Sequence, residues 1–205
     1  MTARVLLATR SAGKLRELVP LFADAGIEAV TLDAAGIAES AEEDGLETFE
    51  TFEENALAKA RWFHARAGGL PVVADDSGLE VAHLGGKPGV RTKRWSGRTD
   101  LTGQALDDAN NAALLAALAG VADRRARYVC VAAFVGPEGE RTFRGETAGR
   151  ITHAAAEGDG GFGYDPYFLS DELGCTFAEA DRRSKERVSH RGRAFAQLVA
   201  WLRRG

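Results

Sequence analysis

The chain has 205 residues and a formal net charge of −4, with 45% hydrophobic and 27% charged residues. This length suits one domain, or two lobes that share one core, and the near-average composition excludes wholesale disorder and a collagen-like structure. The acidic balance argues against duplex nucleic acid as the main partner, and no apolar run reaches the ~18 residues of a membrane span. Because the first residues lack a signal-peptide pattern, we expect a cytoplasmic protein.

The cysteine content and the uneven charge distribution narrow the classes of protein to which the chain can belong. Cys130 and Cys175 lie too far apart for a redox motif or a metal-ligand pair, so we expect buried, reduced thiols. Residues 39–54 hold eight acids and no Lys or Arg, whereas residues 182–205 hold eight bases and one acid. Either run alone is more often a solvated face. Together, a cation-seeking and an anion-seeking patch suit a metal-assisted reaction on a phosphate.

The first half of the chain alternates predicted strands and helices. Hydrophobic periodicity predicts strands at 4–9 and 27–32 on either side of a helix at 13–25. Thr51 and Glu54 form a capping box, which predicts a helix that runs to the glycines at 68–69. Two further strands, at 71–75 and 79–84, are predicted around a turn at 76–78, and a glycine-rich loop over 85–97 follows.

The second half adds two helices and a hairpin. An alanine-rich amphipathic helix is predicted over 102–119, strands over 127–135 and 140–145 are joined at 137–139, and the last helix runs over 189–203. No repeat or linker marks a domain boundary, so residues 1–205 are interpreted as one domain. The fold class is α/β with a mixed sheet.

The turn after the first predicted strand, residues 9–14, is the first candidate for chemistry. Backbone N–H groups at a helix start, a glycine and Lys14 can cradle a phosphate, although neither a Walker motif nor GxGxxG is present. An ordinary strand-to-helix turn explains the segment about as well.

Asp75 and Asp76 form the second candidate, at the predicted carboxyl end of an apolar strand, where open α/β sheets gather their active sites. Adjacent carboxylates repel unless a cation lies between them or one is protonated. With no His or Cys nearby, hard oxygen ligands favour Mg²⁺ or Mn²⁺ over Zn²⁺. A structural Asp turn that only caps a hairpin is the alternative.

Two further candidates lie near the carboxyl end. In the glycine-rich segment 160–166, Phe162 can stack on a base and Asp165 can accept hydrogen bonds from ring N–H groups. Lys185 and the Ser189-His190-Arg191 run can contact a phosphate and a purine carbonyl. A plain glycine loop and an N-cap on a basic surface helix are the competing explanations.

Six segments in this order resemble the noncanonical purine nucleoside triphosphate pyrophosphatases, the family of XTP/dITP diphosphatases and inosine triphosphatases. They are TRSAGKLREL (9–18), TFEENALAKAR (51–61), ADDSGLEVAHLGGKPGV (74–90), RWSG (94–97), GDGGFGYDPYF (158–168) and KERVSHRG (185–192). The resemblance implies an elongated, two-lobed α/β fold with a long mixed central sheet flanked by helices, a deep substrate cleft and a homodimer. It also implies hydrolysis of ITP, dITP and XTP to the monophosphate and pyrophosphate, which sanitises the nucleotide pool.

The resemblance assigns roles position by position. The family's phosphate-contacting turn matches Thr9, Arg10, Ser11, Ala12, Gly13 and Lys14. Glu47 falls at a metal-binding glutamate, and Asp76 at the catalytic carboxylate that also binds Mg²⁺, with Asp75 supporting it. The substrate-binding positions match Ser77, Phe162, Gly163, Tyr164, Asp165, Lys185, His190 and Arg191. Asn55 and Lys59, four residues apart, share one helix face and are added to the substrate site.

The chain departs from the family pattern at three places. Ser11 stands where the family usually has a phosphate-holding Asn, so Arg10 or Ser11 takes over that contact in our interpretation. Glu47 is not followed by the usual Thr-Gly, which leaves Glu43 and Glu50 as competitors for the metal. Ser184 replaces the usual Glu before Lys185.

The predicted mechanism is metal-assisted attack of water on the α-phosphorus, with Glu47 and Asp76 holding the metal and Asp76 as base. A carboxylate with a pKa near ~4 is a weak base, so we expect the metal's effect on the water to matter more and the pH optimum to be alkaline. Two alternatives remain: a Maf-like nucleotide pyrophosphatase with another base preference, which the SHRG segment disfavours, and a nucleotide-binding regulator without turnover, which the intact Asp pair disfavours.

Overall fold

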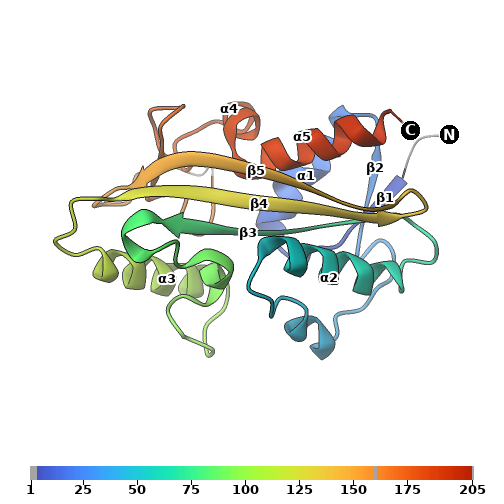
Figure 1. The fold of residues 1–205 in the computed structure, drawn as a ribbon, viewed down its shortest axis with the longest axis horizontal. Helices are drawn as coiled ribbons and strands as arrows, with labels where there is room; N and C mark the ends of the chain where they lie inside the picture. The colour runs from blue at the N-terminus through green and yellow to red at the C-terminus, as the bar shows by residue number, and fades with distance from the viewer. Residues whose placement is uncertain (1–3, 159–160, 205) are drawn as a thin grey trace. The chain divides into compact units, whose positions relative to one another are not determined.

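The structure is a computed structural model that describes residues 4–158 and 161–204. Part of the glycine-rich segment at 158–163 therefore lies outside the described residues. The strands are β1 (Arg4–Leu7), β2 (Glu28–Thr31), β3 (Val72–Val81), β4 (Arg125–Gly136), β5 (Gly139–Ile151) and β6 (Phe168–Ser170). The helices are α1 (Ala12–Asp24), α2 (Phe52–His64), α3 (Gly103–Ala117), α4 (Arg182–Val188) and α5 (His190–Leu202) (Figure 1).

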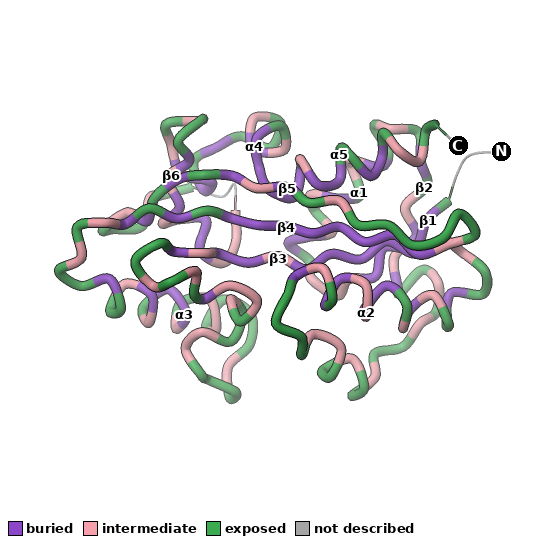
Figure 2. The backbone as a smooth tube through the Cα atoms, viewed as in Figure 1, coloured by how far each residue is buried: buried purple, intermediate pink, exposed green. Residues whose placement is uncertain are grey.

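The strands form one six-stranded sheet in the order β2-β1-β3-β4-β5-β6. β1 pairs in parallel with β2 and with β3, and β5 pairs antiparallel with β6, so the sheet is mixed. This confirms the predicted α/β class and the βαβ opening. Figure 2 shows that β3 and β4 are buried along most of their length, as expected for strands inside a sheet with helices on its faces.

The predicted turn at residues 76–78 is wrong. β3 continues without a break from Val72 to Val81, so the two aspartates stand inside a strand and not at its carboxyl end. An Asp-Ser-Gly run is typical of turns because these side chains compete for backbone hydrogen bonds. Here Asp76 and Ser77 have side-chain partners of their own, and the backbone stays in the sheet.

The chain forms two compact units, each with its own core. The described residues of 1–76, 130–145 and 194–205 form the first unit, and those of 77–129 and 146–193 form the second. In the first unit α1 and α5 pack together, with the rings of Phe22 and Phe195 5.9 Å apart in an edge-to-face contact. The second core gathers Leu114, Tyr128 and Phe168. β3, β4 and β5 each continue from one unit into the other.

Hydroxyl side chains cap three helix starts, among them the Thr51 cap that the sequence predicts. Ser11 caps α1 and Thr51 caps α2, each with its hydroxyl accepting from a backbone N–H three residues on. Ser189 caps α5, since its Oγ accepts from the N–H of Gly192 at 3.0 Å. Gly192 cannot carry a side chain, because a Cβ there would lie 1.7 Å from the carbonyl oxygen of Glu186. Glycine thus lets α5 begin directly against the end of α4.

Short elements were missed. The sequence analysis did not predict α4, β6 or the 3₁₀ turns η1 (Ala41–Gly45), η2 (Ala82–Leu84) and η3 (Gly89–Arg94). Each is too short for hydrophobic periodicity to stand out. Neither cysteine is in a disulfide, and Cys130 is buried as predicted, whereas Cys175 is partly exposed. No helix among residues 4–158 and 161–204 is long and apolar enough to cross a membrane.

Candidate active site

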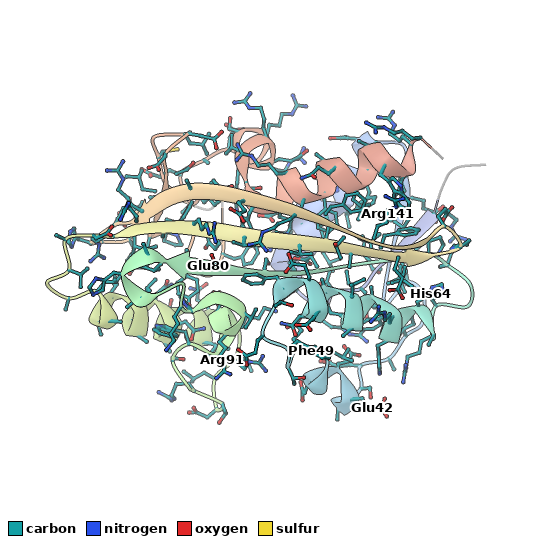
Figure 3. The ribbon with its side chains drawn as sticks, viewed as in Figure 1. Glu42, Phe49, His64, Glu80, Arg91 and Arg141 are labelled. Carbon is teal, nitrogen blue, oxygen red and sulfur yellow. The ribbon has the colours of Figure 1, made fainter. Side chains whose placement is uncertain are left out.

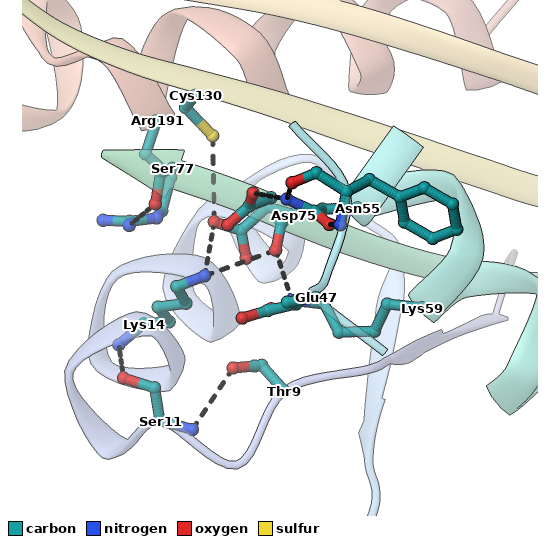
Figure 4. Close-up of polar contacts among 12 residues, drawn as sticks. Thr9, Ser11, Lys14, Glu47, Asn55, Lys59, Asp75, Ser77, Cys130 and Arg191 are labelled. Carbon is teal, nitrogen blue, oxygen red and sulfur yellow. Dashed lines mark hydrogen bonds and ion pairs between the residues drawn. The ribbon is translucent and has the colours of Figure 1, made fainter. Parts of the chain in front are cut away.

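Two buried carboxylates on β3 form the centre of the candidate site in the first unit. Asp75 and Asp76 are only 1% and 6% exposed. Consecutive strand residues point to opposite faces, and the two side chains accordingly have different partners. Asp75 pairs with the ammonium of Lys14 at 2.8 Å, whereas Asp76 accepts from Nδ2 of Asn55 at 3.0 Å (Figure 4). The positive charge of Lys14 thus relieves the repulsion between the two neighbouring carboxylates on the Asp75 side.

Two buried lysines supply the positive charge that the aspartates need. The ammonium groups of Lys14 and Lys59 both donate to the backbone carbonyl of Asp75. Lys59 also forms an ion pair with Glu47. Burial lowers the pKa of Lys59, but the carboxylates of Glu47, Asp75 and Asp76 outweigh it and leave that pKa raised. Lys59 therefore stays charged and holds Glu47 toward β3.

The Asp76 carboxyl has an unusual proton affinity. Burial, reinforced by the nearby Glu47 carboxylate, raises the pKa of Asp76 to about 6, although Lys59, Lys14 and Asn55 favour its ionised form. The sequence analysis assumed the ordinary value of ~4, but desolvation destabilises a buried carboxylate and raises its pKa. A carboxylate with a pKa nearer to neutrality is a better proton acceptor.

Asn55 confirms the expectation that α2 presents Asn55 and Lys59 on one face. Its side chain is fully buried and bridges two segments. Nδ2 donates to Asp76, while the amide also exchanges two hydrogen bonds with the backbone of Phe49. Phe49, whose side chain is labelled in Figure 3, is itself exposed. Asn55 thus fixes the acidic segment 46–50 beside the Asp76 carboxylate.

The predicted phosphate turn sits at the start of α1. Ser11 donates its N–H to the hydroxyl of Thr9 and caps the helix with its own hydroxyl. The Arg10 guanidinium does not point freely at a ligand, because it binds Glu43 through two hydrogen bonds of 2.8 and 3.1 Å and the carbonyl of Ile37. This contact lowers the pKa of Glu43. Glu43 is therefore engaged with Arg10, which weakens it as a competitor of Glu47 for a metal.

In the second unit, Lys185 and Asp165 form a buried ion pair. The ammonium lies 2.8 Å from Oδ2 of Asp165, and the same oxygen accepts from the N–H of Phe162 at 2.9 Å. Burial, reinforced by the Asp165 carboxylate that accepts a hydrogen bond from the Tyr128 hydroxyl, raises the pKa of Tyr128 well above its ordinary value. Gly161 leaves room for this carboxylate, since a Cβ there would lie 2.4 Å from it.

Three basic residues near the carboxyl end are buried and do not form a solvated face. Lys185, His190 and Arg191 are each 5% exposed or less. The His190 ring stacks on Tyr128 with the ring centres 4.5 Å apart. Arg191 donates to the hydroxyl of Ser77 at 2.9 Å, and its guanidinium carbon lies 5.6 Å from the centre of the Phe162 ring. The second unit thus brings together the predicted residues of the segment 161–166, called the aromatic loop below, and the His190-Arg191 pair.

Two residues that the sequence analysis overlooked hold this loop. On α3, Asp107 accepts from the N–H of Gly163 at 3.1 Å, and Asn111 donates to the carbonyl of the same glycine at 3.0 Å. The sequence feature that could have revealed these two residues is the polar run DDANN at 107–111 inside an alanine-rich helix. Tyr164, the next residue of the loop, donates to the carbonyl of Thr92 at 2.7 Å.

Comparison with known proteins assigns the family. The Ham1 family model matches residues 5–201. The chain belongs to the Ham1 family. It is 48% identical to a dITP/XTP pyrophosphatase of Bordetella parapertussis, over 98% of this chain and 91% of that protein. It is equally identical to a dITP/XTP pyrophosphatase of Frankia alni, over 98% and 97%.

Solved structures of Ham1 proteins share the fold. A HAM1 protein from Coxiella burnetii superposes with a TM-score of 0.82 at 34% identity, covering 99% of this chain and all of that one. A nucleoside-triphosphatase, described as a dITP/XTP pyrophosphatase, from Mycobacterium abscessus gives 0.69 at 42% identity, covering 95% and 98%. The family expected from the six sequence segments is thereby confirmed.

The carboxylate oxygens of this Ham1 chain are suitable ligands for a hard divalent cation, provided that the phosphates of a nucleotide supply further oxygen ligands. No group of three or more His, Cys, Asp or Glu residues gathers for a metal within the described part of the chain. Glu47 and Asp76 are close enough for one to raise the pKa of the other. Mg²⁺ is commonly held by one or two carboxylates plus phosphate oxygens and waters, so two carboxylates suffice for it.

Proposed function

We propose that this chain hydrolyses noncanonical purine nucleoside triphosphates, such as ITP, dITP and XTP, to the monophosphate and pyrophosphate, and so removes them from the nucleotide pool. The observation that carries the proposal is the buried Asp76, held by Asn55 beside Glu47 and two lysines, in a chain that matches dITP/XTP pyrophosphatases over nearly its full length. Such a carboxylate suits proton abstraction at a charged substrate.

In the reaction that we propose, the oxygen of a water bonds to the α-phosphorus and the bond from that phosphorus to the bridging oxygen breaks. Asp76 orients the water and takes its proton, and pyrophosphate leaves. Glu47 and Asp76 would hold Mg²⁺ or Mn²⁺, which supplies charge neutralisation on the phosphates and a lower pKa for the water. Lys14 and Lys59, fixed by Asp75 and Glu47, add positive charge around the triphosphate.

The phosphates are proposed to lie at the start of α1. The backbone N–H groups of this turn and the positive end of the helix dipole favour an anion there. Ser11 keeps the turn in shape as the N-cap. In this proposal the positive charge of Arg10 attracts the phosphates from a distance. Its side chain binds Glu43 and is not a direct phosphate ligand.

The base is proposed to be recognised by the second unit. Hypoxanthine and xanthine present an N1–H donor and an O6 acceptor, the reverse of adenine. Arg191 can donate to O6. Asp165 already accepts from Lys185 and Phe162 and bonds Tyr128, which leaves about one of the roughly four acceptor sites of a carboxylate for N1–H. Phe162 is the candidate for stacking.

From the resemblance, we further propose a homodimer that acts in the cytoplasm. Light scattering coupled to size-exclusion chromatography would report the mass in solution. A monomer under conditions of full activity would contradict the dimer proposal without affecting the chemistry.

The deciding experiment is a panel of nucleoside triphosphates with Mg²⁺, scored for each product. We expect ITP, dITP and XTP to give monophosphate and pyrophosphate, with ATP and GTP much slower. Primary release of orthophosphate would contradict the proposal. A preference for other bases would favour the Maf-like alternative, and binding without any pyrophosphate release would favour a nucleotide-binding regulator.

A further inference from the structure

One glycine of the aromatic loop is held at both ends by the same helix. The N–H of Gly163 donates to Asp107 at 3.1 Å, and its carbonyl accepts from Asn111 at 3.0 Å. Asp107 and Asn111 are four residues apart on α3, so they lie one above the other on one helix face. The peptide units on both sides of Gly163 are thus fixed against a rigid element.

The loop needs such an anchor because of its own sequence. Gly163 has a positive φ of 65° and no side chain to pack, so little within the residue itself restricts its backbone. Its neighbours carry the groups that we assign to the base: Phe162 precedes it, and Asp165 follows two residues later. A change in the backbone at Gly163 would therefore move the stacking ring relative to the Asp165 carboxylate.

Asn111 and Asp107, the two residues that hold Gly163, differ in burial and in their hydrogen bonding. Asn111 is 6% exposed, and its amide oxygen has no hydrogen-bond partner within the described residues, so the bond from its Nδ2 to Gly163 alone orients the amide. Asp107 is partly exposed, and burial raises its pKa even though the N–H of Gly163 favours the ionised form. One anchor is a donor and the other an acceptor, which matches the polarity of the glycine backbone.

We propose that Asp107 and Asn111 are positioning residues that set the base selectivity of the enzyme, by fixing the Gly163 backbone between Phe162 and Asp165. The inference rests on the proposed function, because it assumes that this loop receives the purine. Selection between two purines depends on hydrogen bonds that are directional, and a displacement of ~1 Å can cost about 10²-fold in rate. A loosened loop should hence lose selectivity before it loses all turnover.

The test uses substitutions that keep the approximate size of the side chain and change its hydrogen bonding and charge. Asn111→Asp replaces the donor to the Gly163 carbonyl with a second acceptor. We expect the ratio of kcat/KM for dITP over dATP to fall about tenfold or more, mainly through KM for dITP. Asp107→Asn retains an acceptor for the Gly163 N–H and should keep most of the selectivity, whereas Asp107→Leu should lose it.

Asn110→Asp is the matched control. Asn110 neighbours Asn111 on α3 and is also buried. It holds a different segment by donating to the carbonyl of Lys93 and accepting from the N–H of Ser96. The substitution removes the same kind of bond and should cost similar stability. It should leave the dITP-to-dATP ratio unchanged, and thermal unfolding of every variant shows whether it is folded.

The outcomes separate the two proposals. An active wild type whose selectivity is unaffected by Asn111→Asp, or affected equally by Asn110→Asp, overturns the positioning role and leaves the proposed function standing. If Asn111→Asp does not fold, the comparison of Asp107→Asn with Asp107→Leu decides, and equal selectivity in these two overturns the inference. A wild type that releases no pyrophosphate from dITP overturns both.

Discussion

Glu47, Asp75 and Asp76 are all acids, yet their surroundings give each a different task. Asp75 pairs with Lys14 and Glu47 pairs with Lys59, while Asp76 accepts a hydrogen bond from the neutral amide of Asn55. Burial and the nearby Glu47 carboxylate raise the pKa of Asp76 to about 6. Of the two adjacent aspartates, Asp76 is thus the one suited to exchange a proton.

Replacing Asp76 tests this assignment. Asp76→Asn removes a proposed metal ligand and base but keeps the shape of the side chain, and its amide oxygen can still accept from Asn55. We expect kcat to fall by about 10²–10⁴-fold, the range typical for loss of a general base, with the protein folded. Steady-state kinetics at saturating Mg²⁺ would measure it. Asp24→Asn, at an exposed end of α1, is the control, and near-normal activity of a folded Asp76→Asn variant would reject the role.

The acidic segment allows a second test, which compares three glutamates. Glu47→Gln should raise the Mg²⁺ concentration for half-maximal rate, because a hard cation loses an anionic ligand. Glu43→Gln and Glu50→Gln should leave it almost unchanged, since Glu43 is engaged with Arg10 and Glu50 is exposed. Mg²⁺ titrations of all three variants decide the point. A larger shift at Glu43 or Glu50 than at Glu47 would relocate the metal.

Sequence reasoning identified the acids but not their surroundings. The resemblance supplied Glu47 and Asp76, and the spacing of Asn55 and Lys59 on α2 indicated a common face. The pairing of Lys14 with Asp75 and of Arg10 with Glu43 could not be predicted, because each joins residues more than thirty positions apart. Desolvation depends on the same long-range packing, so the raised pKa of Asp76 could not be predicted from the sequence either.

At the scale of elements, long periodic segments were predicted well and short or polar ones were not. The five strands β1 to β5 and helices α1, α2, α3 and α5 all occur near their expected positions. β3 was split in two because Asp-Ser-Gly has strong turn propensity, and tertiary pairing overrode it. The sequence analysis gave no role to the polar face of α3, although Asn110 and Asn111 are buried and fix two neighbouring segments.

Arg124 joins α3 to the sheet and provides a test at this scale. Its buried guanidinium donates to the carbonyls of Leu118, Ile151 and Thr152 at 2.7 to 2.9 Å. A lysine cannot reproduce this planar arrangement, so Arg124→Lys should leave about two carbonyls without a donor and cost about 3 kcal/mol. For a chain of this size the melting temperature should fall by about 6–12 °C.

The neighbouring Arg125 is the matched control. Its side chain is 80% exposed and pairs with Asp123, a contact of small energetic value at the surface. Arg125→Lys should change stability by less than about 0.5 kcal/mol. Equal melting temperatures for the two variants would show that the buried hydrogen bonds of Arg124 contribute little.

For the whole molecule, the shared strands determine how the two units unfold. β3, β4 and β5 each contribute residues to both cores, so melting either core removes packing from strands that the other core also needs. Cooperative unfolding is expected when one part cannot lose its structure without exposing the buried surface of the other. We therefore expect one thermal transition for the chain.

A core substitution in one unit, observed from the other, tests this expectation. Phe195→Ala empties part of the first core and should cost about 3–5 kcal/mol. Trp95 lies in the second unit, so a chain with Trp62→Phe and Trp201→Phe reports that unit alone by fluorescence. Phe195→Ala should lower the midpoint seen by Trp95 by about 10 °C, as much as in calorimetry. Phe177→Ala in the second core should likewise lower both midpoints. Two separate transitions, with the midpoint seen by Trp95 unchanged in Phe195→Ala, would mean that the units unfold independently.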